Sequence, residues 1–222
     1  MGLLEAIVVV YLRKIYYPTG FKFPLKIIPN DVLKVEILRE FCTLVMLISI
    51  ALIAGKNKLQ VFSYFLFCFA VWDITYYAGL KFMLNWPASF FTWDILFLIP
   101  FPWIGPVSAP ITASLSMIIL ALTLLSIKSR FDNFKIKLIE WLLIFSGAVI
   151  IFISFIWDYI SIYITKKIIS QVLTMSQANL EGLTYSYVPT FFNWSLFISG
   201  ILLVYLSIFL LIKRTLNLKK NN

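Results

Sequence analysis

The clearest absence in this chain of 222 residues is histidine, of which there is none. Histidine supplies the axial ligand of many haem sites, the nitrogen ligands of zinc and the general base of Ser-His and Cys-His catalysis. All of these site classes are therefore excluded. Cysteine is also scarce, because Cys42 and Cys68 are the only two and they form no CxxC motif. We expect free thiols rather than a redox pair.

Charge is the second shortage, since charged residues make up only 13% of the chain while hydrophobic residues make up 61%. A soluble domain carries about 25% charged residues, and a chain of this size has too little interior to hide so much apolar surface. Lipid must therefore cover much of the molecule, and the sequence predicts an all-α integral membrane helical bundle. The net charge of +9 then belongs to the borders of the membrane, so the expected partner is the lipid bilayer and not nucleic acid.

Five segments are long and apolar enough to cross a bilayer as helices. They form one transmembrane domain, residues 33–213, and are followed by a basic cytoplasmic tail, residues 214–222. Residues 1–32 are predicted to be an N-terminal interfacial amphipathic segment, because Glu5, Arg13 and Lys14 interrupt an apolar run of helical spacing. The five predicted spans are residues 35–54, 60–80, 104–127, 138–160 and 194–212.

The segment 88–110 is apolar but too rich in proline to be one regular helix. We expect a short helix at about 90–99 and then a turn, packed against the bundle as a re-entrant or surface element, because irregular backbone survives at membrane depth only where protein or water covers it. The residues that break the segment are Pro100, Pro102, Trp103, Gly105, Pro106 and Pro110.

The loops predict the orientation of the chain. The loop after the first span, the loop after the third span and the C-terminal tail share one side of the membrane, and their bases place that side in the cytoplasm. The outer loop, residues 165–192, and residues 81–103 hold only three bases. Five spans would place the N-terminus outside the cytoplasm. Five further bases near the N-terminus argue against that placement, so the sequence does not decide on which side of the membrane the N-terminus lies. The ten bases on the cytoplasmic side are Lys56, Lys58, Lys128, Arg130, Lys135, Lys137, Lys213, Arg214, Lys219 and Lys220.

Ionisable residues inside a bilayer are costly and are therefore the candidate site residues. In the second predicted span, Asp73 shares about one helical face with Tyr76 or Tyr77 and with Lys81. Asp73 must be protonated or paired at this depth. The group is either a polar pin that holds the bundle together or a place where substrate or protons are handled.

Four more charged residues are predicted in the same outer half: Arg39 and Glu40 in the first span, Asp94 in the broken segment and Asp158 in the fourth span. Together with Asp73 and Lys81 they would form a mutually compensated polar network. The alternative is that Arg39, Glu40 and Asp158 are ordinary interface residues in contact with water.

One stretch of the sequence carries a resemblance. It includes Trp72-Asp73-Ile74, Trp86-Pro87-Ala88-Ser89, the run from Thr92 to Pro100, and Pro102-Trp103-Ile104-Gly105-Pro106-Val107 followed by Ala109-Pro110. Residues 33–125 resemble an uncharacterised family of bacterial polytopic membrane proteins. The resemblance implies a multi-pass protein of the prokaryotic cytoplasmic membrane, and it implies nothing about a reaction or a ligand.

Three functions remain open at this point. The first is a non-catalytic subunit or scaffold of a membrane assembly, with a membrane-protein partner or a second copy of the chain. The second is a small-solute or proton-coupled transporter using Asp73. The third is a membrane enzyme that acts on a lipid-like substrate with Asp73, Lys81 and Asp94. No nucleotide-binding or catalytic motif is present, and we expect neither a cofactor nor a metal.

Overall fold

The structure, a computed structural model, describes the whole chain except residues 27, 100–101, 132, 166–186 and 221–222. The described part is mainly helical with one small two-stranded sheet, which confirms the predicted all-α class. The elements in chain order are α1 Gly2–Tyr16, α2 Asn30–Ala54, α3 Lys58–Leu84, β1 Trp93–Phe97, β2 Trp103–Pro106, α4 Ser108–Arg130, α5 Leu138–Thr165 and α8 Trp194–Lys220.

Five helices, α2, α3, α4, α5 and α8, are long and apolar enough to cross a membrane, as predicted. The ends of α3 illustrate how sequence sets the bounds. The Asn57 side chain accepts the backbone N–H of Gln60 at 3.1 Å and so caps the first turn. At the other end Asn85 adopts the left-handed conformation, with φ 51°, that commonly stops a helix.

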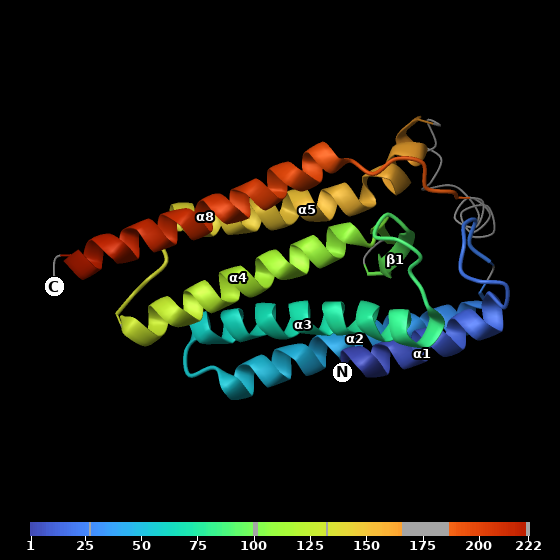
Figure 1. Cartoon of the computed structure of the whole chain (residues 1–222), viewed down its shortest axis with the longest axis horizontal. Helices are drawn as coiled ribbons and strands as arrows, with labels where there is room; N and C mark the ends of the chain where they lie inside the picture. Colours follow the sequence, from blue (N-terminus) through green and yellow to red (C-terminus); the bar gives the residue numbers. More distant parts are fainter. Residues whose placement is uncertain (27, 100–101, 132, 166–186, 221–222) are drawn as a thin grey trace.

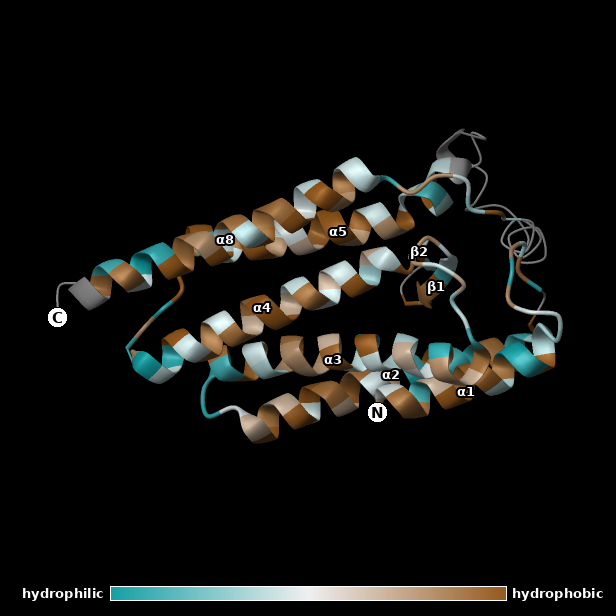
Figure 2. Cartoon of the chain, in the orientation of Figure 1, coloured by the Kyte–Doolittle hydropathy of each residue, from teal (hydrophilic) through white to brown (hydrophobic). Residues whose placement is uncertain are grey.

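The helices run along the long axis of the molecule in stacked layers (Figure 1). The paired helices α5 and α8 form one side, α4 lies in the middle and contacts both α8 and α3, and α3 packs against α1 and α2. Figure 2 shows apolar residues along the middle of the bundle and hydrophilic residues gathered toward its ends. We call the end near Lys58, Arg130 and Leu138 the basic end, and the end near the sheet the hairpin end.

Helix α1 lies within residues 1–32, for which the sequence predicts an interfacial segment. It lies alongside α3 and packs against it. Small residues make this close approach possible: Ala6 is fully buried, and a Cβ added to Gly79 would lie 2.8 Å from the Ala6 Cβ. One of the three charges that interrupt the apolar run of this helix is Arg13, and its side chain is buried against a partner described below.

The short helix predicted at about 90–99 is wrong, because β1 and β2 form an antiparallel hairpin there. Trp93 pairs with Pro106 and Asp94 with Gly105, and these pairings satisfy backbone groups that an isolated short helix would leave open. Helix α4 therefore begins at Ser108 instead of 104, with Pro110 in its first turn, where the missing N–H is not needed. Pro100, a predicted breaker of this segment, lies outside the described residues.

Candidate functional site

A buried ion pair ties α1 to the hairpin. The Arg13 Nη2 atom donates to Asp94 Oδ1 at 2.9 Å, and the two side chains are only 8% and 2% exposed. Tyr77 of α3 donates its hydroxyl to the other oxygen, Oδ2, at 3.3 Å. The Arg13 guanidinium also lies over the Trp86 ring, 3.6 Å from its centroid, a cation–π contact that favours a desolvated guanidinium. Three segments far apart in sequence therefore meet at Asp94.

Burial of Asp94 strengthens the affinity of its carboxylate for a proton. Burial raises the pKa of Asp94 to about 6, while the Arg13 guanidinium, the Ile95 backbone N–H and the Tyr77 hydroxyl oppose that rise. At neutral pH the carboxylate is therefore mostly ionised, and Arg13 is the group that keeps it so. Its role in the described structure is to hold elements together.

A second set of contacts joins α2 to the same region. Both carboxylate oxygens of Glu40 accept from the Leu98 backbone N–H, at 3.1 and 3.0 Å, so α2 holds the chain just after β1. Arg39 donates its Nε to Glu36 at 2.8 Å and forms an ion pair with Glu5 of α1. The predicted outer-half charges thus act as cross-links between elements.

The remaining predicted residues do not join this group. Lys81 donates to the backbone carbonyl of Pro87 at 3.0 Å, at an exposed position. Asp158 of α5 accepts the Tyr187 hydroxyl at 2.6 Å and the Thr190 backbone N–H at 3.1 Å. Tyr76 is buried in the apolar cluster between α1 and α3. The predicted single network of six charged residues is therefore divided into separate contacts.

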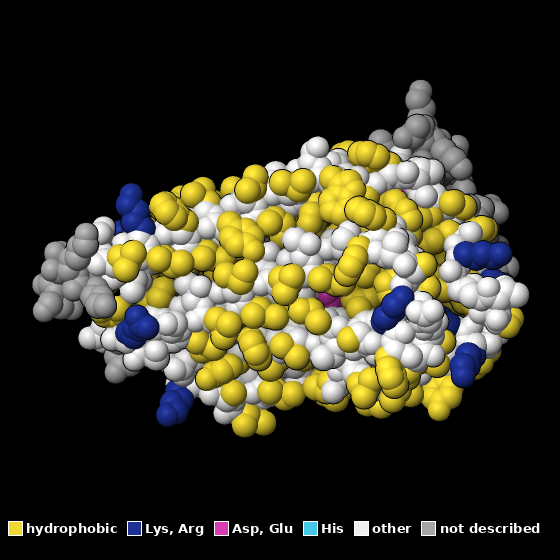
Figure 3. All heavy atoms as spheres, in the orientation of Figure 1, with side chains coloured by type: hydrophobic (Ala, Val, Ile, Leu, Met, Phe, Trp, Pro, Cys, Tyr) yellow, Lys and Arg dark blue, Asp and Glu magenta, His cyan; other side chains and the backbone are white. Residues whose placement is uncertain are grey.

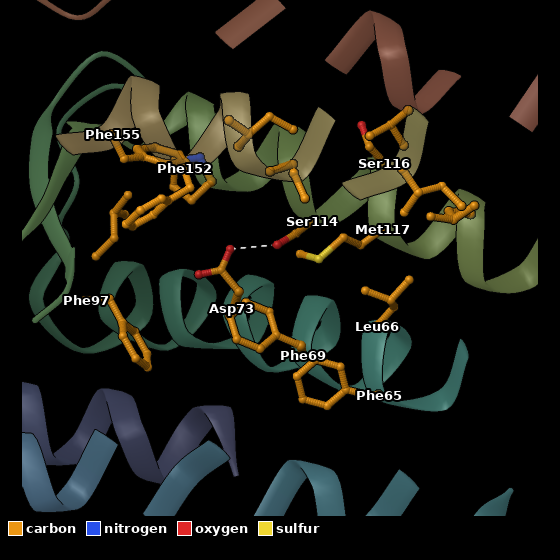
Figure 4. Close-up of a pocket in the computed structure, with 18 of the residues that line it drawn as sticks. Phe65, Leu66, Phe69, Asp73, Phe97, Ser114, Ser116, Met117, Phe152 and Phe155 are labelled. Carbon is orange, nitrogen blue, oxygen red and sulfur yellow. Dashed lines mark hydrogen bonds between the residues drawn. The ribbon is translucent and has the colours of Figure 1, made fainter. Parts of the chain in front are cut away.

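Asp73 stands apart, because it faces a cavity. A cavity of about 290 Å³ lies between α3, α4 and α5, with one α8 residue in its wall. Leu96, Phe97 and Trp103 of the hairpin line it as well. In Figure 4 the Asp73 side chain of α3 and the Ser114 side chain of α4 point toward one another inside this space. The Ser114 hydroxyl donates to Asp73 Oδ2 at 2.7 Å.

The wall of the cavity is mainly apolar, and its polar residues within the described ranges are Trp72, Asp73, Ser114 and Ser116. Among the described residues that line the cavity, Asp73 is the only ionisable one. No described residue forms a hydrogen bond with its second oxygen, Oδ1. Figure 4 shows that oxygen turned away from Ser114, on the side where Phe97 lies. Figure 3 shows acidic atoms midway along a face that is rich in apolar side chains, with Lys and Arg side chains to either side of them. The Asp73 carboxyl group is thus an open acceptor inside an apolar space.

The described residues around the cavity do not provide a set of metal ligands. Among the described residues no three His, Cys, Asp or Glu side chains are grouped so that they could hold an ion. A single carboxylate with a hydroxyl beside it can accept a hydrogen bond, pair with a cation or exchange a proton. Those are the chemical abilities of the cavity.

The sequence identifies Asp73 and Asp94 as candidates but not their partners Ser114 and Arg13. An isolated charge in a half-length apolar run is typical of an interfacial helix, so the sequence predicts Arg13 at the membrane surface. Nothing in the spacing of Ser114 distinguishes it from the other small residues of the third span. Comparison of the chain with protein-family models, curated proteins and solved structures finds no match.

Proposed function

We propose that this multi-pass membrane protein binds a small solute in the cavity at Asp73 and takes no catalytic part in changing it. The observation that carries the proposal is the open Asp73 oxygen inside an apolar cavity of about 290 Å³. Cavities of this size, apolar with a few placed polar groups, are typical of small-molecule sites. Such a site suits a transporter, in which Asp73 would hold the solute or a proton at membrane depth.

The cross-links at the hairpin end support the non-catalytic part of the proposal. An enzyme that used Asp73, Lys81 and Asp94 together would need the three side chains around one substrate. Neither Lys81 nor Asp94 lines the cavity, and Asp94 is engaged by Arg13. A subunit or scaffold of a larger assembly remains compatible with solute binding, and native mass spectrometry in mild detergent tests it: a stable lone monomer would contradict it.

The orientation is also part of the proposal. Eight bases lie at the basic end on described loops and helix ends, and they favour a cytoplasmic position for that end. Of the five bases that argue against this orientation, Arg13 has an acidic partner in Asp94. The eight are Lys56, Lys58, Lys128, Arg130, Lys135, Lys137, Lys213 and Arg214. The C-terminus would then be cytoplasmic, as in a protein of a prokaryotic inner membrane.

Filling the cavity tests the proposed function. The probes are 4-phenylbutylamine and 4-phenylbutan-1-ol, and saturable binding to the protein in nanodiscs is measured by equilibrium dialysis against empty nanodiscs. Ala113 lines the cavity, so Ala113→Phe should abolish binding of whichever probe the wild-type protein takes. Ala78 is exposed on α3, so Ala78→Phe is the matched control and should bind normally. Absence of saturable binding of both probes, or binding unaffected by Ala113→Phe, would refute the proposal.

A further inference from the structure

The wall around Asp73 has a composition that selects one class of solute. Seven Phe and two Trp residues are among the 22 described residues that line the cavity, and no Lys or Arg is among these 22. In Figure 4, Phe69 lies beside Asp73 on α3, Phe97 lies to one side of the carboxyl group, and Phe152 and Phe155 lie across the cavity from it. Aromatic faces carry negative potential, and together with a carboxylate they attract cations in a water-poor space.

We propose that the cavity takes a lipophilic cation, a small molecule with an apolar body and a protonated amine that donates to Asp73 Oδ1. This inference rests on the proposed function and names its solute class. The carboxylate supplies a counter-charge, and its open oxygen supplies an acceptor for the amine N–H. The aromatic wall covers the body of the molecule and contributes cation–π contacts near its head.

Anionic and uncharged solutes fit the wall less well. An anion would meet the Asp73 carboxylate with no basic side chain among the described residues of the wall to compensate it. An alcohol can donate a hydrogen bond to Asp73 as an amine can, but it brings no positive charge to the carboxylate. The alcohol probe is therefore the sharpest comparison for the amine probe.

The two probes share a phenylbutyl body and differ at pH 7 in one charged group. We expect wild-type protein to bind 4-phenylbutylamine at least about tenfold more tightly than 4-phenylbutan-1-ol. Asp73→Asn should remove that preference, because the amide of asparagine can still accept the Ser114 hydroxyl but carries no charge. Asp158→Asn removes the same charge at a carboxyl group outside the cavity wall, and it should leave the preference intact.

A second variant separates a binding role from a structural role of the Asp73–Ser114 pair. Ser114→Ala breaks the same hydrogen bond but keeps the carboxylate, so the amine preference should survive in it. If the pair only pins α3 to α4, Ser114→Ala and Asp73→Asn should act alike on both probes, which would overturn the inference.

The outcomes also distinguish this inference from the proposed function. Equal binding of amine and alcohol, with both lost in Ala113→Phe, would overturn the cation assignment and leave the solute site standing. Tighter binding of the alcohol would do the same, because it would show that charge pairing with Asp73 does not decide the affinity.

Discussion

Replacing Arg13 by glutamine should uncover the cost of burying Asp94. The Arg13–Asp94 pair joins two side chains that are 8% and 2% exposed, at 2.9 Å. Removing one partner of a buried ion pair leaves the other charge uncompensated, which costs about 3–5 kcal/mol of unfolding free energy. We therefore expect Arg13→Gln to lose about 3–5 kcal/mol at pH 8. Lys14→Gln, a neutralisation at the neighbouring exposed position, should change stability by less than about 0.5 kcal/mol.

The pH dependence makes this prediction specific to Asp94. Burial raises the folded-state pKa of Asp94 to about 6, above about 3.9 for an unfolded chain. The folded protein therefore binds the proton more tightly, so the stability that Asp94 contributes is fully present below about pH 4 and is lost as pH rises through about 6. Without Arg13 the folded-state pKa of Asp94 must lie higher still, because the main opposing charge is gone.

The difference in unfolding free energy between wild type and Arg13→Gln should therefore grow as pH rises from 6 to 8. Its slope is at most about 1.4 kcal/mol per pH unit for one proton. Reversible unfolding in mixed micelles, followed by tryptophan fluorescence at pH 6, 7 and 8, measures it. A loss of less than about 1 kcal/mol at pH 8, or a loss that does not change with pH, would refute the reasoning.

Two further predictions concern other contacts of the same end. Glu40→Gln replaces a charged acceptor of the Leu98 N–H by a neutral one. This change should lower the free energy of unfolding by about 1 kcal/mol and speed hydrogen exchange of the Leu98 amide about fivefold. Unchanged exchange would contradict the contact between α2 and the hairpin. Gly79→Leu should lower stability by about 1–3 kcal/mol, because a Cβ there meets Ala6 at 2.8 Å. Its control is Ala78→Leu at the neighbouring exposed position, and equal melting temperatures of the two variants would count against close packing of α1 on α3.

The five spans could be predicted from the sequence because membrane helices depend on local composition. A run of about 20 apolar residues satisfies its own backbone and needs no distant partner to be recognised. Asp73 could be recognised for the same reason, since any carboxyl group in such a run is conspicuous. The hairpin could not, because Trp93-Asp-Ile-Leu-Phe97 is a short apolar run that periodicity alone cannot assign to helix or strand. Its state is decided by pairing with β2.

The partners of the charged residues could not be predicted from the sequence for a different reason. Arg13 and Asp94 are 81 residues apart in the chain, and charge alone does not tell which of several acids a base will meet. The position of α1 depends in turn on small residues, Ala6 and Gly79, whose close packing is visible only in three dimensions. The Asp73–Ser114 contact likewise arises from the packing of α4 on α3.

The most direct test of the central claim is a cryo-electron-microscopy map of the protein in nanodiscs with 4-phenylbutylamine bound. We expect density for the probe in the cavity between α3, α4 and α5, with its nitrogen about 3 Å from Asp73 Oδ1 and its ring among the Phe side chains of the wall. A cavity closed by its own side chains, or probe density that lies away from Asp73, would contradict it.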